Sequence, residues 1–287
     1  MKKIISMISL VLLLGFTACE DAIDLNVAEG QSYPVLDAWI TTDQGVQTIR
    51  LTMSVPYTAQ DSAPAVKEAR IILNDLTSGN SYPFTYNGGV YTYDASARPI
   101  GYVNHVYKLH IEYKNEIFEG TDSIKRVPPI DSILFGHKTA EEATSGKEGF
   151  YAKFFAVDIP GAGDNYWIRS YRNDTLHRLK DLLSIDGSLE GGISDGTPFI
   201  LPLTQHITDY EHPFRLNETV VVRLSSLSKK SYDFMAQVYQ QITTTGLFAK
   251  VLENVPSNMQ NTTPKGKVKM LGWFGTSAVS RAERKIK

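Results

Sequence analysis

Residues 82–93 read YPFTYNGGVYTY, and this stretch gives the clearest indication of how the 287-residue chain folds. Aromatic side chains occupy alternate positions before and after the tripeptide Asn87-Gly88-Gly89. Alternate side chains of a strand share one face, so each run has the pattern of a half-buried strand. Asn-Gly between two such runs favours a tight turn, because both central residues of that turn need positive φ. The stretch therefore predicts a β-hairpin.

The same period of two extends outward through the N-terminal half. In the run Val46–Ser54, Ile49, Leu51 and Met53 alternate with polar residues. Seven short runs of this kind are separated by turn residues, at 33–40, 46–54, 69–73, 82–86, 90–93, 107–113 and 116–120. Short strands at regular spacing without helical periodicity are typical of an antiparallel sandwich. We therefore predict an immunoglobulin-like β-sandwich over residues 33–126.

A second β-rich domain is expected over residues 132–287, after a proline-containing linker at 127–131 that is stiff and extended. Apolar residues at i, i+3, i+7 and i+10 from Tyr232 mark one helical face and predict a helix near 229–244, with Ser228 as N-cap and Gly246 as terminator. The strands expected in this half are 133–135, 150–157, 166–171, 199–203, 219–224 and 268–276. The fold class is thus mostly β with one helix.

Residues 1–18 have the composition of a lipoprotein signal peptide. Two lysines precede the apolar run Ile4–Phe16, whose length suits a signal-peptide core and is too short to span a bilayer. Cys19, the only cysteine, follows two small residues. We predict that Cys19 is diacylated and begins the mature chain, with residues 19–32 as a lipidated tether. The alternative is a plain secretory signal peptide with a cysteine nearby.

Composition limits the remaining function classes. The 29 Lys and Arg residues are balanced by 31 Asp and Glu residues, so nothing attracts nucleic acid electrostatically. With Cys19 lipidated, no cysteine is left for a disulfide, and the core alone must hold the fold. No segment after residue 18 is apolar for long enough to cross a membrane, so acyl chains are the expected attachment.

Several motifs together resemble a known family. They are Cys19, the stretches 34–40 (PVLDAWI), 127–133 (VPPIDSI), 158–161 (DIPG), 165–169 (NYWIR), 231–234 (SYDF) and 271–275 (LGWFG). The chain is similar in this order and spacing to the Bacteroidota lipoproteins grouped as domain of unknown function family 4249. The resemblance implies an outer-membrane lipoprotein, in a setting similar to that of accessory lipoproteins of TonB-dependent transporters. It implies no activity.

Glu20 and Asp21 resemble the signal that carries such lipoproteins to the outer face of the outer membrane; the alternative is an acidic pair in a solvated linker. Four sequences also resemble the acceptor pattern for O-glycosylation in Bacteroidota. Their acceptor residues are Ser62, Ser123, Ser132 and Thr175. Ser62 is favoured because it lies in a polar loop.

Residues that could support chemistry occur only in loops. Ser194 lies in a G-x-S-x-G sequence, but neither a strand nor a helix flanks it as a nucleophile elbow requires. Two groups have metal-ligating side chains without a recognised spacing: His206, Asp209, Glu211 and His212, and Asp186, Glu190 and Asp195. Asp158 and Asp164 flank a glycine-rich turn and are expected to cap its backbone. The sequence therefore predicts no catalytic residue, no metal and no cofactor.

The expected function is that of a non-catalytic accessory or ligand-binding partner of a TonB-dependent β-barrel transporter, anchored in the outer membrane through Cys19 and facing the cell exterior. The first alternative is a structural or adhesive surface lipoprotein that binds proteins through its β-sandwich. The second is an enzyme using Ser194 or His206. Tyrosines and tryptophans bind sugars and peptides, although most are expected to pack in sheets. A ligand is expected first at the loops 184–198 and 204–216.

Overall fold

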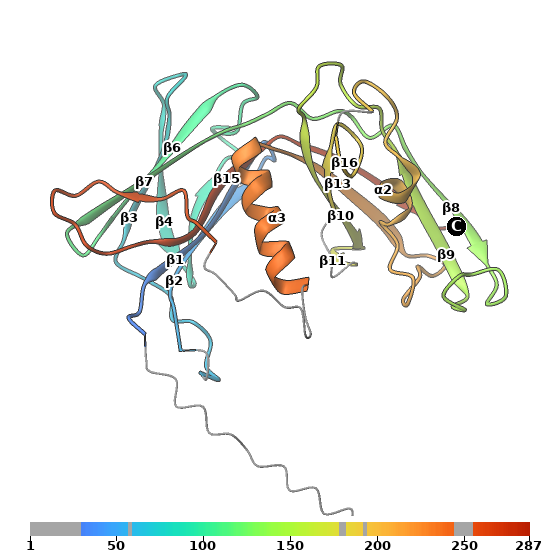
Figure 1. Ribbon diagram of the computed structural model, residues 1–287, viewed down its shortest axis with the longest axis horizontal. Coiled ribbons are helices and arrows are strands. Elements are labelled where there is room, and N and C mark those ends of the chain that lie inside the picture. The colour runs from blue at the N-terminus through green and yellow to red at the C-terminus, as the bar shows by residue number, and fades with distance from the viewer. Residues whose placement is uncertain (1–29, 57–58, 178–181, 192–193, 244–254) are drawn as a thin grey trace, which may run out of the picture. The chain divides into compact units, whose positions relative to one another are not determined.

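The computed structural model describes residues 30–56, 59–177, 182–191, 194–243 and 255–287 (Figure 1). Ser32–Lys287 forms one compact unit. Strands make up 45% of the structure and helices 8%, which confirms the predicted mostly-β class.

The first sheet has nine strands and includes every strand predicted in the N-terminal half. Its order is β14-β7-β6-β3-β4-β5-β2-β1-β15. The strands are β1 Pro34–Thr41, β2 Val46–Met53, β3 Arg70–Asp75, β4 Ser81–Asn87, β5 Val90–Asp94, β6 Val106–Tyr113, β7 Glu116–Ser123, β14 Gln260–Asn261 and β15 Leu271–Ser277. The predicted hairpin is β4–β5, in which Asn87 faces Val90, and Gly88 and Gly89 both have positive φ. The turn chemistry is therefore as the sequence predicts.

This sheet curls around a single core. The first half of β4 pairs with β3 and its second half with β5, so the sheet bends along β4. Near its two ends, the backbone N–H of Thr276 in β15 donates to the carboxylate of Asp122 in β7 over 2.7 Å. The enclosed side chains come from strands on both sides of the bend, including Leu36, Leu51, Leu73, Leu109 and Phe118. A continuous curled sheet replaces the two separate sheets expected of an immunoglobulin-like sandwich.

The C-terminal part of the chain also contributes to this sheet. β15 runs parallel to β1, with Leu36 opposite Gly272 and Trp39 opposite Gly275. Gly272 has φ +84°, and a Cβ there would collide with the carbonyl oxygen of Leu36; a Cβ on Gly275 would meet the Trp39 ring. The two glycines allow β15 to approach β1. The sequence pattern predicts residues 260–277 in the second domain, because no local pattern indicates a pairing with a strand so distant in the chain.

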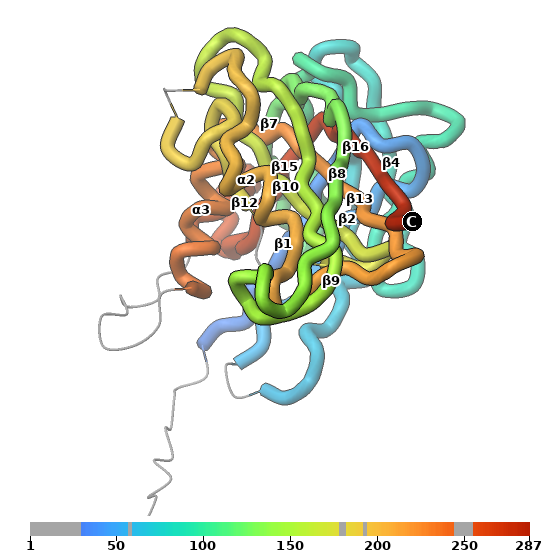
Figure 2. The backbone as a smooth tube through the Cα atoms, turned by 90° about the vertical axis from the view of Figure 1, so that its right-hand side faces the viewer, coloured from blue at the N-terminus to red at the C-terminus, as the bar shows by residue number. Residues whose placement is uncertain are grey.

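The second half contains a five-stranded sheet and a hairpin. The sheet order is β11-β10-β13-β16, with β12 also paired to β10. Its strands are β10 Asn165–Arg172, β11 Thr175–Leu176, β12 Leu182–Ile185, β13 Thr219–Leu227 and β16 Val279–Lys285. The hairpin joins β8 Ser132–Lys138 to β9 Gly149–Phe155 and faces the viewer in Figure 2. A second core lies in this half and includes Ile133, Phe154, Tyr166, Phe214 and Leu224.

A short helix, α2 Leu201–Gln205, corrects the strand expected at 199–203. Pro202 lies in its first turn, where the missing N–H costs nothing, whereas a proline would remove one bond from a strand ladder. Phe199 and Leu203, four residues apart, are both buried in the second core. Phe199 precedes α2, whose N-cap is Ile200, and Leu203 is buried from within the helix. The expected strand was wrong because the run is too short to distinguish the two periods.

The predicted helix is α3, Lys229–Thr243. The hydroxyl of Ser228 accepts a hydrogen bond from the backbone N–H of Ser231 over 3.1 Å, which confirms the predicted N-cap. Gly246, the expected terminator, lies outside the described residues. Phe234 of α3 stacks on Trp273 of β15, with ring centroids 4.5 Å apart. Within the described ranges, no helix is long and apolar enough to cross a membrane.

Aromatic and ionic contacts join the two halves. Trp39 of β1 packs against Trp167 of β10, with ring centroids 5.4 Å apart. Asp43, after β1, forms a salt bridge with Arg223 of β13. Val127, in the predicted linker, packs against both hydrophobic cores. The linker is therefore part of the packed structure.

Candidate functional site

A pocket of about 490 Å³ lies at the β8–β9 hairpin, and we call it the hairpin pocket. Its volume is within the range of small-molecule sites. The residues that line it come from β8, β9, the loop between them, α2 and the segment after α2: Leu134, Phe135, Gly136, His137, Lys138, Thr144, Ser145, Tyr151, Ala152, Lys153, Gln205 and Tyr210.

Strand alternation gives the hairpin two different faces. On one face, Ile133 and Phe154 form a cross-strand pair buried in the second core. On the other face, Gly136 lies opposite Tyr151, beside the pair of Leu134 and Lys153. Nothing lies within 4 Å of the position a Cβ would take on Gly136. Gly136 is exposed and therefore leaves open space on this face of the hairpin, opposite Tyr151.

The segment after α2 forms the other wall of the pocket, and hydrogen bonds attach it to β9. The hydroxyl of Thr208 accepts from the N–H of Ala152 over 2.9 Å and donates to the carbonyl of Ala152 over 3.0 Å. Phe150 and Phe214 exchange backbone hydrogen bonds of 2.8 and 3.1 Å. These bonds fix the segment that carries Tyr210, whose ring lies 5.8 Å from the Tyr151 ring at an angle of 40°.

The Tyr151 ring is held by the loop between β8 and β9. Its hydroxyl donates to the carbonyl of Lys147 over 2.7 Å and lies 3.0 Å from the hydroxyl of Ser145. The carboxylate of Glu142 accepts from the backbone and side chain of Thr139, and these bonds lower the pKa of Glu142. The loop is thus an ordered turn with its own hydrogen bonds.

The pocket carries positive charge. Lys138 places its Nζ 5.0 Å from the Tyr151 ring centroid, and the Nζ of Lys153 lies 5.2 Å from the Phe155 ring. None of the described lining residues is acidic. The nearby acids have other partners, since Glu142 bonds to Thr139 and Glu148 pairs with His137 over 3.4 Å. The lining thus combines two ammonium groups, two tyrosine rings and polar side chains.

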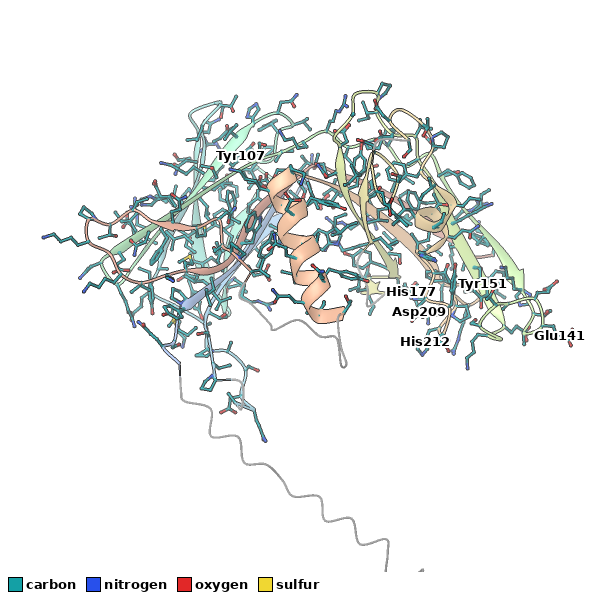
Figure 3. The ribbon with its side chains drawn as sticks, viewed as in Figure 1. Tyr107, Glu141, Tyr151, His177, Asp209 and His212 are labelled. Carbon is teal, nitrogen blue, oxygen red and sulfur yellow. The ribbon has the colours of Figure 1, made fainter. Side chains whose placement is uncertain are left out.

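A histidine that the sequence did not single out lies close to this wall (Figure 3). His177 is buried, stacks on Phe214 with ring centroids 3.8 Å apart, and accepts the N–H of Asp209 at Nε2 over 3.2 Å. Burial, together with the charge of Arg172, lowers the pKa of His177 to about 4. Because the ring is neutral and its Nε2 is already an acceptor, His177 supports the segment 209–214 as a structural residue.

The histidines and acids at 206–212, for which no metal site was predicted, do not form a cluster of metal-ligating side chains in the described structure. Asp209 accepts from the N–H of Glu211 and lies 2.9 Å from the His212 ring, while His206 packs against Tyr210. The only group of metal-ligating side chains within the described ranges is elsewhere, in Asp158, Asp164 and Asp186. All three aspartates are candidates in the sequence, but their sequence positions do not show that they form one cluster.

These three aspartates have carboxylate oxygens within 4.8 Å of one another. Arg126 forms a salt bridge of 2.6 Å with Asp164. Asp186 accepts the N–H groups of Gly163 and Asp164 over 2.8 and 2.7 Å, so this turn is capped by an aspartate from another loop, whereas Asp158 and Asp164 were the expected caps. Oxygen ligands suit calcium, but in this structure backbone donors and one guanidinium already compensate the charges.

Asp158 is buried, with 2% of its surface exposed. Burial raises the pKa of Asp158, and the charges of Asp164 and Asp186 add to this effect. Its two oxygens accept from the Tyr166 hydroxyl over 2.5 Å and from the N–H of Gly196 over 3.2 Å. The aspartate cluster therefore connects the loops around residues 158–165 and 186–196. Asp195 binds the N–H of Gly161, and Glu190 is exposed outside the cluster.

Ser194 does not have the surroundings of a nucleophile. It is 5% exposed, and its Oγ has no hydrogen-bond partner in the described part of the chain. Residues 194–197 form a turn in which the carbonyl of Ser194 accepts from Thr197. No helix follows this turn, because α2 begins only at Leu201.

The residues predicted to be modified differ in their accessibility. Cys19, Glu20 and Asp21 lie outside the described residues. Ser62, Ser132 and Thr175 are exposed, whereas Ser123 is half-buried in β7 between the buried residues Asp122 and Ile124. Glycosylation at all four positions stays a prediction.

Most aromatic side chains serve packing. All three tryptophans lie in aromatic contacts, Trp39 with Trp167 and Trp273 with Phe234. Tyr107, labelled on the first sheet in Figure 3, is buried, and burial raises its pKa to about 12. Tyr151 and Tyr210 differ, because they line a pocket and Tyr210 is 36% exposed. The sequence alone could not separate packing tyrosines from pocket-lining tyrosines, because both have polar neighbours in the sequence.

The fold and pocket define a mostly-β protein with a preformed, ligand-sized site. The chain belongs to the family described as Domain of unknown function (DUF4249), whose family model matches residues 20–283. The resemblance expected from the sequence motifs is therefore confirmed. No curated protein matches the chain.

Proposed function

We propose that this protein is a lipid-anchored, non-catalytic lipoprotein of the bacterial outer membrane that binds a small ligand on behalf of a TonB-dependent β-barrel transporter. The hairpin pocket supports the ligand-binding role. It has open space at Gly136, and Tyr210 lines it from the segment after α2. A preformed pocket on a rigid β scaffold binds without a large ordering cost.

The anchor rests on sequence features. Cys19 after an apolar run supports lipidation, and Glu20-Asp21 supports display on the outer face. The pairing with a transporter and the assignment to the Bacteroidota rest on the motifs quoted above. The absence of a catalytic role is part of the same proposal, supported by the arrangement of Ser194 and of the 206–212 segment.

The test of the anchor is membrane fractionation. Wild-type protein should fractionate with outer membranes, and Cys19→Ala should move to the soluble fraction. Cys19→Ala that remains in the membrane fraction would contradict lipidation at this residue. A Ser62→Ala variant is the matched control, because it changes an exposed small residue outside the signal.

The test of the partnership is affinity purification of the tagged, lipidated protein from solubilised outer membranes. A β-barrel transporter should be recovered in stoichiometric amount. Recovery of surface-fibre subunits without a barrel would favour an adhesive or structural role. One observation bears on that second reading: β8 forms a strand ladder only with β9 in the described structure, while the side chain of Arg284 from β16 donates to the carbonyl of Ile133 in β8 over 2.6 Å.

A further inference from the structure

We infer that the hairpin pocket binds an acidic sugar, that is, a sugar ring that carries a carboxylate. This inference deepens the proposed ligand-binding function and rests on it. Lys138 and Lys153 would bind the carboxylate, and the faces of Tyr151 and Tyr210 would contact the ring.

The pocket lining carries a net positive charge. Two lysines and no acid among the described lining residues make the pocket attractive to an anion. Neither lysine forms a salt bridge within the described part of the chain; each lies over an aromatic ring. Both ammonium groups therefore keep hydrogen-bond donors available for a carboxylate, and a charged acceptor gives the stronger bond.

Two tyrosines and a glycine determine the shape of the pocket. Tyr151 and Tyr210 are tilted by 40° with centroids 5.8 Å apart, so they form two non-parallel aromatic walls. The empty position above Gly136 lies beside Tyr151 and provides room for a ring against its face. Such flat apolar faces suit a sugar ring, and Gln205, Thr144 and Ser145 supply polar groups for its hydroxyls.

The test is titration calorimetry of the soluble Cys19→Ala chain with three probes: digalacturonate, its neutral counterpart digalactose, and N-acetyltyrosine, which carries a carboxylate and an aromatic ring. Digalacturonate should bind at least about tenfold more tightly than digalactose, and its affinity should fall as salt is added. N-acetyltyrosine binding as tightly as digalacturonate would assign the pocket to aromatic acids and overturn the sugar class.

Two test variants and two controls locate the binding. Gly136→Leu should abolish binding by filling the open space beside Tyr151, and Thr85→Leu, at an exposed strand position of the first sheet, should leave it unchanged. Lys138→Met with Lys153→Met should remove the preference for the charged probe. Lys114→Met is the matched control, because its Nζ lies 5.3 Å from a tyrosine ring outside the pocket. Unfolding midpoints of all variants should equal that of the parent.

The outcomes separate this inference from the broader function. Equal affinity for digalacturonate and digalactose, lost in Gly136→Leu, would refute the anion preference and leave the pocket as a binding site. Binding of digalacturonate that survives Gly136→Leu would place it elsewhere and overturn the inference. No binding by any probe would also overturn it, while transporter recovery in the affinity purification tests the wider proposal independently.

Discussion

At the scale of single residues, Asp122 connects three elements through one buried carboxylate. Its Oδ2 accepts from the backbone N–H of Thr276 over 2.7 Å and from the hydroxyl of Ser231 over 2.9 Å. Ser231 in turn accepts the indole N–H of Trp273 over 2.9 Å. β7, β15 and the first turn of α3 are therefore connected by a continuous polar network inside an apolar region, where an unpaired member is costly.

A pH-dependent stability follows from this burial. Burial raises the pKa of Asp122 above its ordinary value of 3.8, although hydrogen bonds from Ser228, Thr276 and Ser231 oppose the shift. The folded state thus favours the protonated acid, so stability present below about pH 4 is lost as the pH rises through the folded-state value. Relative to Asp122→Asn, which does not ionise, wild type should lose free energy of unfolding over this window. Urea titrations at several pH values measure this. If the difference in free energy of unfolding between wild type and Asp122→Asn does not change with pH, the proposed effect of burial is contradicted.

His177 should produce the opposite dependence. Its pKa of about 4 in the folded state lies below the ordinary value of 6.5, so its stabilising contribution is present above about pH 6.5 and is lost as the pH falls toward 4. Wild type should lose up to about 3 kcal/mol relative to His177→Gln across this range. Urea unfolding at several pH values measures this difference in the free energy of unfolding. If NMR shows that His177 titrates near pH 6.5, its pKa is not lowered and the explanation is wrong.

At the scale of elements, the pairing of β1 with β15 depends on a glycine that a side chain cannot replace. Gly272→Ala introduces both a collision with the Leu36 carbonyl and a strained positive φ, and should cost at least about 2 kcal/mol. Gly136→Ala, with open space and no positive φ, is the matched control and should change stability by less than about 0.5 kcal/mol. Thermal unfolding of the two variants provides the comparison, and similar costs would contradict this account of β15.

The elements that the sequence predicted are those with a long local period. All seven N-terminal strands and α3 were predicted because alternation or helical spacing extends over several residues. β11 and β14 have only two residues each, too few for any period. The parallel pairing of β1 with β15 joins segments far apart in the chain, and single-sequence periodicity carries no information about such partners.

The same limit applies to the site. Loop 204–216 was predicted to contain binding residues, and Gln205 and Tyr210 do line the pocket. Lys138, Tyr151 and Lys153 were missed because each looks like an ordinary outward residue of a strand or loop. The aspartate cluster also became visible only when two loops that are separate in the sequence were brought together by the fold.

At the scale of the whole molecule, the two hydrophobic cores are linked by shared contacts. Val127 packs against both cores, and Trp39 packs against Trp167 between the sheets. The soluble Cys19→Ala chain should therefore unfold in one transition, with tryptophan fluorescence and circular dichroism coinciding. Two well-separated transitions would show that the halves are energetically independent.

The hairpin pocket is the proposed ligand site of this protein. Hydrogen–deuterium exchange of the Cys19→Ala chain, with and without saturating digalacturonate, measures whether the ligand binds there. Exchange should slow in residues 134–153 and 205–210, and Gly136→Leu should show no change. Protection confined to the first sheet or α3, or no protection at the hairpin, would contradict binding in this pocket.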